Sequence, residues 1–165
     1  MKIRLLFTVF ALLIATGSGP GTAATLVSGS AAVIGPGVLR VNGQDLRLFD
    51  IRVPGAEAKC AEWQGQKQVG YACDLRARAF LESLVADEAV ACVSEDKGVA
   101  TCYADGRDLA ESLVAAGWAE SCGRGNRYVA EEEAARKAGR GLWAGQFSLD
   151  RQCSERARES RRQEQ

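Results

Sequence analysis

The feature of this sequence that most constrains its fold is a set of six cysteines, all of which follow residue 24. They occupy positions 60, 73, 92, 102, 122 and 153, and no two of them form a C-x-x-C pair. This spacing argues against a zinc site, an iron–sulfur cluster or a thioredoxin-like motif. An even number of cysteines is typical of proteins that fold in an oxidising compartment. We therefore predict three disulfide bonds.

The 24 N-terminal residues have the pattern of a secretory signal peptide. Lys2 and Arg4 precede an apolar stretch from Leu5 to Ala15, and small residues lead up to Ala24. The apolar stretch is too short to span a membrane. We expect cleavage near Ala24, a periplasmic or secreted protein, and no transmembrane segment in the mature chain.

Length, charge and composition limit the possible functions. Removal of residues 1–24 leaves 141 residues with a net charge of −2, which does not favour a nucleic-acid partner. This length suits one domain, which we place at residues 25–150, with a charged tail at 151–165. The sequence has no histidine. A Ser/His/Asp triad, a Cys/His pair, an HExxH zinc site and a histidine general base are therefore excluded.

An Asn-Gly pair separates two strand-like segments, 39–41 and 44–49, and favours the type I′ turn of a two-residue β-hairpin. Counting outward from this turn places Leu39 opposite Leu46, and both leucines are expected to face a core. The charged side chains at positions 40, 45 and 47 then point to the other side.

A second hairpin is predicted from segments 89–95 and 99–103, which flank a three-residue loop that ends in Gly98. Cys92 and Cys102 are equally far from the centre of this loop, so they face each other across the two strands. We predict a Cys92–Cys102 disulfide from this register. The pairs Cys60–Cys73 and Cys122–Cys153 then follow by elimination.

The other predicted elements are a first strand, a glycine-rich turn, a polar loop and three helices, the first of them capped by Asp74. They lie at 28–34, 35–37, 50–70, 74–86, 108–116 and 127–138. The order of strands and helices predicts an α+β, mainly β fold. It is a five-stranded barrel of the oligonucleotide-binding (OB) type with helices packed on one side.

Several short motifs follow one another along the chain. They are 33–49 with Ile51 and Pro54, Tyr71-Ala72-Cys73, Val99-Ala100-Thr101-Cys102, Asp105-Gly106 before Asp108-Leu109-Ala110, 113–119, and Ala134-Ala135-Arg136 followed by 141–147. In this order and spacing they resemble the thermonuclease (staphylococcal-nuclease-like) family, from about residue 30 to residue 150. The resemblance implies an OB barrel with three helices and, in active members, a calcium-dependent phosphodiesterase.

The resemblance also implies a calcium site that this sequence lacks. The family carries its ligands in an Asp-Gly-Asp-Thr motif and an Asp-(Ala/Thr)-Pro-Glu motif, whose glutamate is also the candidate general base. Here Gly35-Pro36-Gly37-Val38 replaces the first motif and Arg52-Val53-Pro54-Gly55 replaces the second. Because a guanidinium cannot coordinate a cation, we predict no metal site and no resident cofactor.

Arg47 matches the first of the family's two catalytic arginines. The second belongs to a Tyr-Gly-Arg motif, where this chain has residues 95–98, so Lys97 is a weak replacement without bidentate geometry. We predict that Arg40, Arg47 and Arg52 bind a phosphate or another anion. The alternative is that these arginines are surface charges paired with Asp45 and Asp50.

The function expected from these residues is that of a non-catalytic binding module. Its partner would be nucleic acid, another anionic polymer or an envelope protein. The alternative is a calcium-dependent nuclease with a rearranged site, in which Asp45, Asp50 and Glu57 replace the missing ligands. Among the tryptophans, Trp118 and Trp143 are expected to close the core, and Trp63 is a candidate contact residue.

Overall fold

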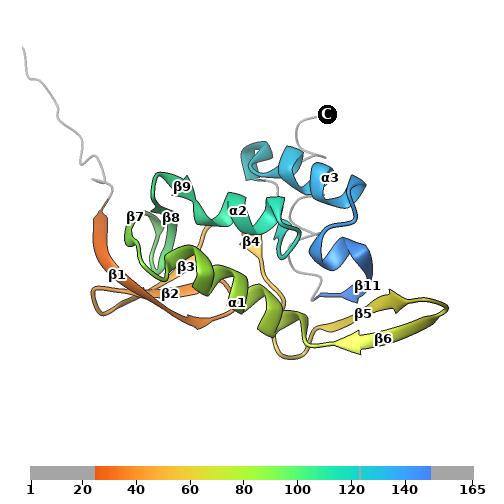
Figure 1. Ribbon diagram of the computed structural model, residues 1–165. Helices are drawn as coiled ribbons and strands as arrows, with labels where there is room; N and C mark the ends of the chain where they lie inside the picture. The colour runs from red at the N-terminus through yellow and green to blue at the C-terminus, as the bar shows by residue number, and fades with distance from the viewer. Residues whose placement is uncertain (1–24, 123, 150–165) are drawn as a thin grey trace, which may run out of the picture.

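The computed structural model describes residues 25–122 and 124–149, so the predicted signal peptide and charged tail lie outside the described residues. Five strands form a closed barrel: β1 (Leu26–Gly35), β2 (Val38–Val41), β3 (Gln44–Leu48), β7 (Ala89–Asp96) and β8 (Val99–Ala104). They pair in the order β3-β2-β1-β7-β8, and a parallel pairing of β3 with β8 closes the barrel (Figure 1). The predicted α+β fold with a five-stranded barrel and three helices is confirmed.

The Asn-Gly hairpin has the predicted register, with Leu39 opposite Leu46. Asn42 and Gly43 have φ angles of 48° and 76°, as both central residues of a type I′ turn require. The two leucines are buried, whereas the charged residues at positions 40, 45 and 47 are exposed, as expected.

The cysteine hairpin has the predicted pairing but a different turn. Cys92 lies opposite Cys102, and the two form a disulfide. The predicted three-residue loop is wrong, because β7 continues to Asp96, which pairs with Val99 across a two-residue turn. An irregularity between Ser94 and Asp96 takes up the extra residue, so the register at the cysteines is kept.

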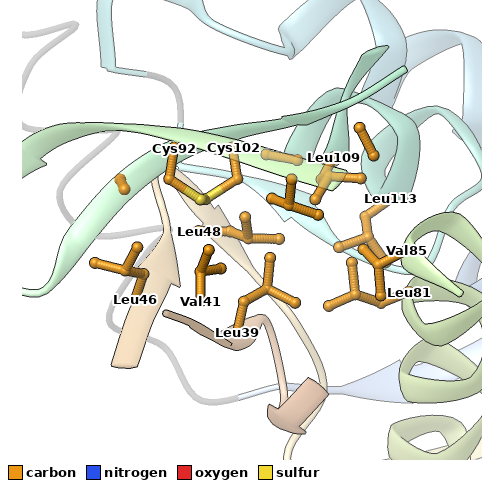
Figure 2. Close-up of a cluster of buried hydrophobic side chains, with 14 of the residues drawn as sticks. Leu39, Val41, Leu46, Leu48, Leu81, Val85, Cys92, Cys102, Leu109 and Leu113 are labelled. Carbon is orange, nitrogen blue, oxygen red and sulfur yellow. A yellow bond between two sulfur atoms is a disulfide. The ribbon is translucent and has the colours of Figure 1, made fainter. Parts of the chain in front are cut away.

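The main core lies between the barrel and two helices, α1 (Cys73–Val85) and α2 (Leu109–Ala115). Figure 2 shows barrel side chains beside the Cys92–Cys102 disulfide, with Leu81 and Val85 from α1 and Leu109 and Leu113 from α2 closing one side. The helices thus cover an apolar opening that the small barrel cannot fill with its own side chains.

The helices begin close to the predicted positions. Asp108 caps α2 by accepting hydrogen bonds from the backbone N–H groups of Ala110 and Glu111. The predicted cap of α1 is wrong, because the helix begins at Cys73, after Ala72, and Asp74 lies in its first turn without a capping bond. An acidic residue there still suits the helix dipole. The third helix, α3, spans Val129–Lys137.

The predicted polar loop at 50–70 is wrong, because most of this segment forms strands. After the short β4 (Ile51–Arg52), β5 (Lys59–Gln64) and β6 (Lys67–Tyr71) form a hairpin, which we call the arm. The arm extends away from the barrel (Figure 1), and β11 (Gly145–Ser148) pairs with its inner strand β5. The predicted order of elements therefore lacked a second, three-stranded sheet.

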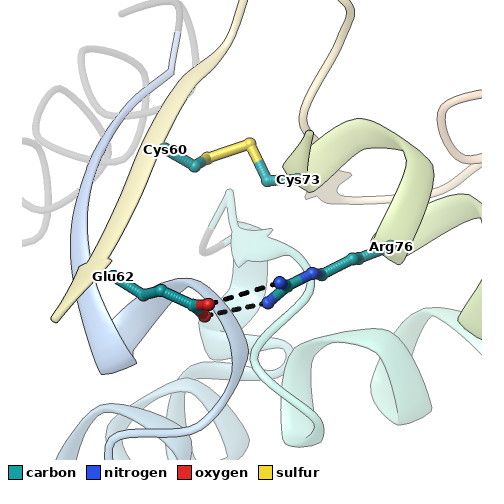
Figure 3. Close-up of a disulfide and its surroundings, with 4 residues drawn as sticks. All are labelled: Cys60, Glu62, Cys73 and Arg76. Atoms are coloured by element: carbon teal, nitrogen blue, oxygen red, sulfur yellow. Dashed lines mark hydrogen bonds and ion pairs between the residues drawn. A yellow bond between two sulfur atoms is a disulfide. The ribbon is translucent and has the colours of Figure 1, made fainter. Parts of the chain in front are cut away.

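The Cys60–Cys73 disulfide joins the base of the arm to the start of α1, as predicted. Beside it, Arg76 of α1 donates hydrogen bonds to both carboxylate oxygens of Glu62, at 2.9 and 3.4 Å (Figure 3). Cys122 is also disulfide-bonded. Its predicted partner, Cys153, lies outside the described residues.

The tryptophans differ in their surroundings. Trp118 packs against both hydrophobic clusters, and Trp143 lies against Phe147 with ring centroids 4.7 Å apart. Trp63, on the arm, has 57% of its surface exposed, so it is accessible for the predicted contact role. None of the helices among the described residues is long and apolar enough to cross a membrane.

Candidate functional site

A pocket of about 360 Å³ opens where β3 ends and the chain turns into β4. Residues 47–52 form one wall, and Asp96 and Val99 of the neighbouring hairpin form another. Cys122 and Arg124, which precede α3, complete the lining. The pocket therefore joins the strand that carries Arg47 to a segment more than 70 residues further along the chain.

Two of the predicted anion-binding arginines line this pocket. Arg47 is exposed, and its side chain has no ion pair within the described part of the chain. Arg52 lies on β4, which pairs with β10 (Glu120–Ser121), and its guanidinium forms an ion pair with Glu120. Both side chains of this pair are mostly buried, at 17% and 20% exposed. Arg52, at the position where the sequence resemblance implies a calcium ligand, is thus a cation with its own counter-ion.

The other predicted site residues lie outside the pocket lining. Arg40 forms a bidentate pair with Asp45, with nitrogen–oxygen distances of 2.6 and 2.9 Å. Lys97 is exposed in the turn between β7 and β8, where its backbone N–H donates to Asp96. The roles of Arg40 and Lys97 in ligand binding remain predictions that this geometry does not support.

An apolar side chain, that of Val53, lies close to Gly37 in the segment that replaces the first acidic motif. Gly37 is buried with φ +62°, and a Cβ atom added there would lie 2.9 Å from Cγ2 of Val53. Within residues 25–122 and 124–149, no three His, Cys, Asp or Glu side chains converge in a way that could hold a metal ion. Three acids could replace the missing calcium ligands under the alternative function. Of these, Asp45 is paired with Arg40, and Glu57 is exposed.

Asp50, the third of these acids, lies in the pocket wall in a different environment from the other two. Its side chain is buried, and its Oδ2 accepts a hydrogen bond from the backbone N–H of Arg124 at 2.9 Å. Burial raises the pKa of Asp50 to about 6, although the nearby guanidinium groups of Arg124 and Arg127 oppose this shift. The pocket therefore contains an acid that titrates close to neutral pH.

Arg124 is a pocket residue that the sequence analysis missed. It is exposed, and its guanidinium lies 5.8 Å from the ring centre of Phe49, which also lines the pocket. Arg127 contacts the same ring at 5.2 Å. The only signal in the sequence was the position of Arg124 two residues after a cysteine, which does not indicate a pocket.

A model of the family described as Staphylococcal nuclease homologue matches residues 45–145. This match covers most of the chain and agrees with the barrel, its three helices and the order of the motifs. The chain belongs to the staphylococcal nuclease family. A comparison with curated proteins gives no match.

Membership of the staphylococcal nuclease family allows the residues of the pocket to be compared with the family's motifs. The family match includes the segment that carries Arg47, Arg52 and Gly55. Arg47, which the motifs match to a catalytic arginine, lines the pocket together with Arg52, and Gly55 follows three residues later. The described lining thus holds three arginines and two aspartates, Asp50 and Asp96.

Proposed function

We propose that this protein is an exported, non-catalytic member of the staphylococcal nuclease family whose pocket binds an anionic ligand. The observation that carries the proposal is the mostly buried ion pair of Arg52 with Glu120, at a position where the resemblance implies a calcium ligand. Three guanidinium groups, those of Arg47, Arg52 and Arg124, belong to residues that line one pocket. Guanidinium groups favour oxyanions, because their N–H groups form charge-assisted hydrogen bonds with them.

Export is supported by the disulfides and by the signal-peptide pattern in the sequence. Two disulfides with both partners described, Cys60–Cys73 and Cys92–Cys102, fit folding in an oxidising compartment.

Arg47 and Arg124 are the exposed cations of the pocket lining, so they are the groups that an incoming anion reaches first.

Calorimetric titration tests this function, with sulfate and a short single-stranded oligothymidylate as probes. We expect both to bind in the presence of a calcium chelator. Arg47→Ala with Arg124→Ala should weaken sulfate binding by about tenfold or more, because charge-assisted hydrogen bonds are lost. Arg40→Ala is the matched control, since it removes an exposed arginine outside the pocket lining.

The same preparation tests the catalytic alternative. Incubation with calcium and single-stranded DNA should leave the DNA intact. Cleavage that a chelator abolishes would overturn the non-catalytic proposal. Failure of sulfate to bind, or equal binding by the pocket variant and the control, would overturn the assignment of the pocket to anions.

A further inference from the structure

Asp50 connects the end of β3, the strand that carries Arg47, to the segment that precedes α3. Its backbone has φ +57° at the end of β3, and its carbonyl oxygen accepts the N–H of Cys122 at 2.8 Å. Its carboxylate accepts the N–H of Arg124 at 2.9 Å. Backbone and side chain of Asp50 therefore both hold the segment that brings Arg124 to the pocket.

The second carboxylate oxygen of Asp50 is in an unusual position. Oδ1 is buried and has no hydrogen-bond partner among the described residues. A charged carboxylate normally accepts hydrogen bonds at both oxygens, and burial of an unpaired one is costly. The neutral carboxyl group carries a smaller cost, because it keeps an acceptor for Arg124 without a buried charge.

The charged groups around Asp50 have both signs. Arg47 and Arg52 lie on the strands before and after it, β3 and β4, and Arg124 and Arg127 come from the segment that leads into α3. Asp96 lines the same pocket, and Glu120 is already paired with Arg52. Glu132 of α3 accepts the backbone N–H of Ser121 in the adjoining segment. Asp50 is the buried acid of the pocket lining, so its charge is the least screened by water.

We propose, building on the anion-binding function, that Asp50 sets the affinity of the pocket for its anion: the charged carboxylate weakens binding, and the neutral carboxyl group strengthens it. An anion between Arg47, Arg52 and Arg124 lies in the same cavity as the Asp50 side chain and is repelled by its negative charge. Protonation removes this repulsion and leaves an acceptor for the Arg124 N–H. The pocket therefore binds an anion more tightly in mildly acidic than in neutral solution.

Linkage gives the proposal a second consequence. If protonation of Asp50 favours the anion, the bound anion must favour the protonated form of Asp50 by the same factor. Binding near pH 6.5 should then take up protons from solution. The pKa of Asp50, raised to about 6 by burial, places this uptake in an accessible range.

The test measures sulfate binding to the wild-type chain between pH 5 and pH 8, a range in which sulfate keeps a constant charge. We expect the dissociation constant to rise about fivefold or more from the acidic to the neutral end, as coupling between charged sites commonly produces. Titrations in buffers with different ionisation enthalpies should show proton uptake near pH 6.5.

Asp50→Asn is the diagnostic variant, because asparagine tolerates the left-handed backbone and keeps an acceptor for Arg124. It should bind sulfate with the high affinity of the acidic wild type at every pH and without proton uptake. Asp96→Asn is the matched control, which removes an exposed acid of the same pocket and should keep the pH dependence. Thermal unfolding confirms that both variants are folded.

The outcomes separate this inference from the function on which it rests. Absence of sulfate binding at every pH would overturn the anion-binding function itself. Binding that is independent of pH in the wild type, or pH dependence that persists in Asp50→Asn, would overturn the role of Asp50 and leave the anion pocket in place.

Discussion

At the scale of single residues, Arg52 and Glu120 form an ion pair beside the pocket that Arg52 lines. Both side chains are mostly buried, and Nε and Nη1 of Arg52 have no hydrogen-bond partner among the described residues. Arg52→Ala would leave the Glu120 carboxylate without its counter-ion in a poorly solvated position. We expect the free energy of unfolding to fall by about 1–3 kcal/mol, measured by urea denaturation.

The double variant Arg52→Ala with Glu120→Ala provides the control for this prediction. It removes the stranded charge as well as its partner, so it should be more stable than Arg52→Ala alone. A single variant as stable as the wild type would show that the pair contributes nothing to the fold.

The raised pKa of Asp50 predicts that the stability of the fold depends on pH. Its pKa is about 6 in the folded chain, above the ordinary value of an unfolded aspartate of about 3.9. Between about pH 4 and pH 6 the folded state therefore binds more protons than the unfolded state, so the free energy of unfolding falls as the pH rises. At neutral pH this effect should lower the free energy of unfolding by about 3 kcal/mol relative to its value near pH 4.

Comparison with Asp50→Asn isolates this contribution from those of the other acids. The variant lacks the buried charge, so it should be more stable than the wild type at pH 7.5 and should lose this advantage near pH 4. Urea denaturation at several pH values measures the difference. A constant difference across this range would show that Asp50 keeps an ordinary pKa.

At the scale of elements, the sequence predicted those hairpins whose turns carry a strong signal. The Asn-Gly turn fixed the register of β2 with β3, and the spacing of Cys92 and Cys102 fixed that of β7 with β8. The arm was missed because β6 is almost entirely exposed, so its residues show no alternation of apolar and polar side chains. Its inner strand β5 also pairs with β11, which lies far along the chain from the arm's turn and gives no local signal there.

The Cys60–Cys73 disulfide should stabilise the arm more than the barrel. Cys60→Ala with Cys73→Ala removes the covalent link between β5 and α1 and leaves the Glu62–Arg76 pair as the main remaining polar contact there. We expect a loss of about 2–4 kcal/mol for a loop of this size. Hydrogen exchange should accelerate in the strands of the arm and in β11, with little change in the barrel strands.

The matched control is Cys92→Ala with Cys102→Ala, which removes the other described disulfide from the centre of the barrel core. Exchange should then accelerate throughout the barrel strands. If loss of Cys60–Cys73 had the same effect on the barrel as loss of Cys92–Cys102, the arm would not be a separate unit of stability.

At the scale of the whole molecule, the pocket depends on contacts that no local pattern encodes. Sequence motifs were sufficient to place Arg47 and Arg52 near a shared site, because both lie close to one strand. Arg124 lies at the same pocket through long-range contacts of its segment: β10 pairs with β4, and Asp50 accepts the backbone N–H groups of Cys122 and Arg124. Arg40 faces the same side of its hairpin as Arg47 but is paired with its cross-strand neighbour Asp45. A local cross-strand pair thus occupies Arg40, whereas long-range contacts bring Arg124 to Arg47 and Arg52.

We predict that the packing of the barrel, as well as its charges, opposes calcium binding at the family ligand positions. A protein with Gly37→Asp, Arg52→Asp and Gly55→Glu regains acids at family ligand positions, and Glu120→Gln removes the carboxylate left without Arg52. In this first protein the new side chain at position 37 still meets Cγ2 of Val53, so we expect no calcium binding.

A second protein adds Val53→Ala, since alanine is one of the residues that the family motif has at this position, and removes that contact. Calcium should then bind and raise the unfolding temperature, measured by calorimetry. Equal calcium binding by the two proteins would show that Val53 does not obstruct the ligand position.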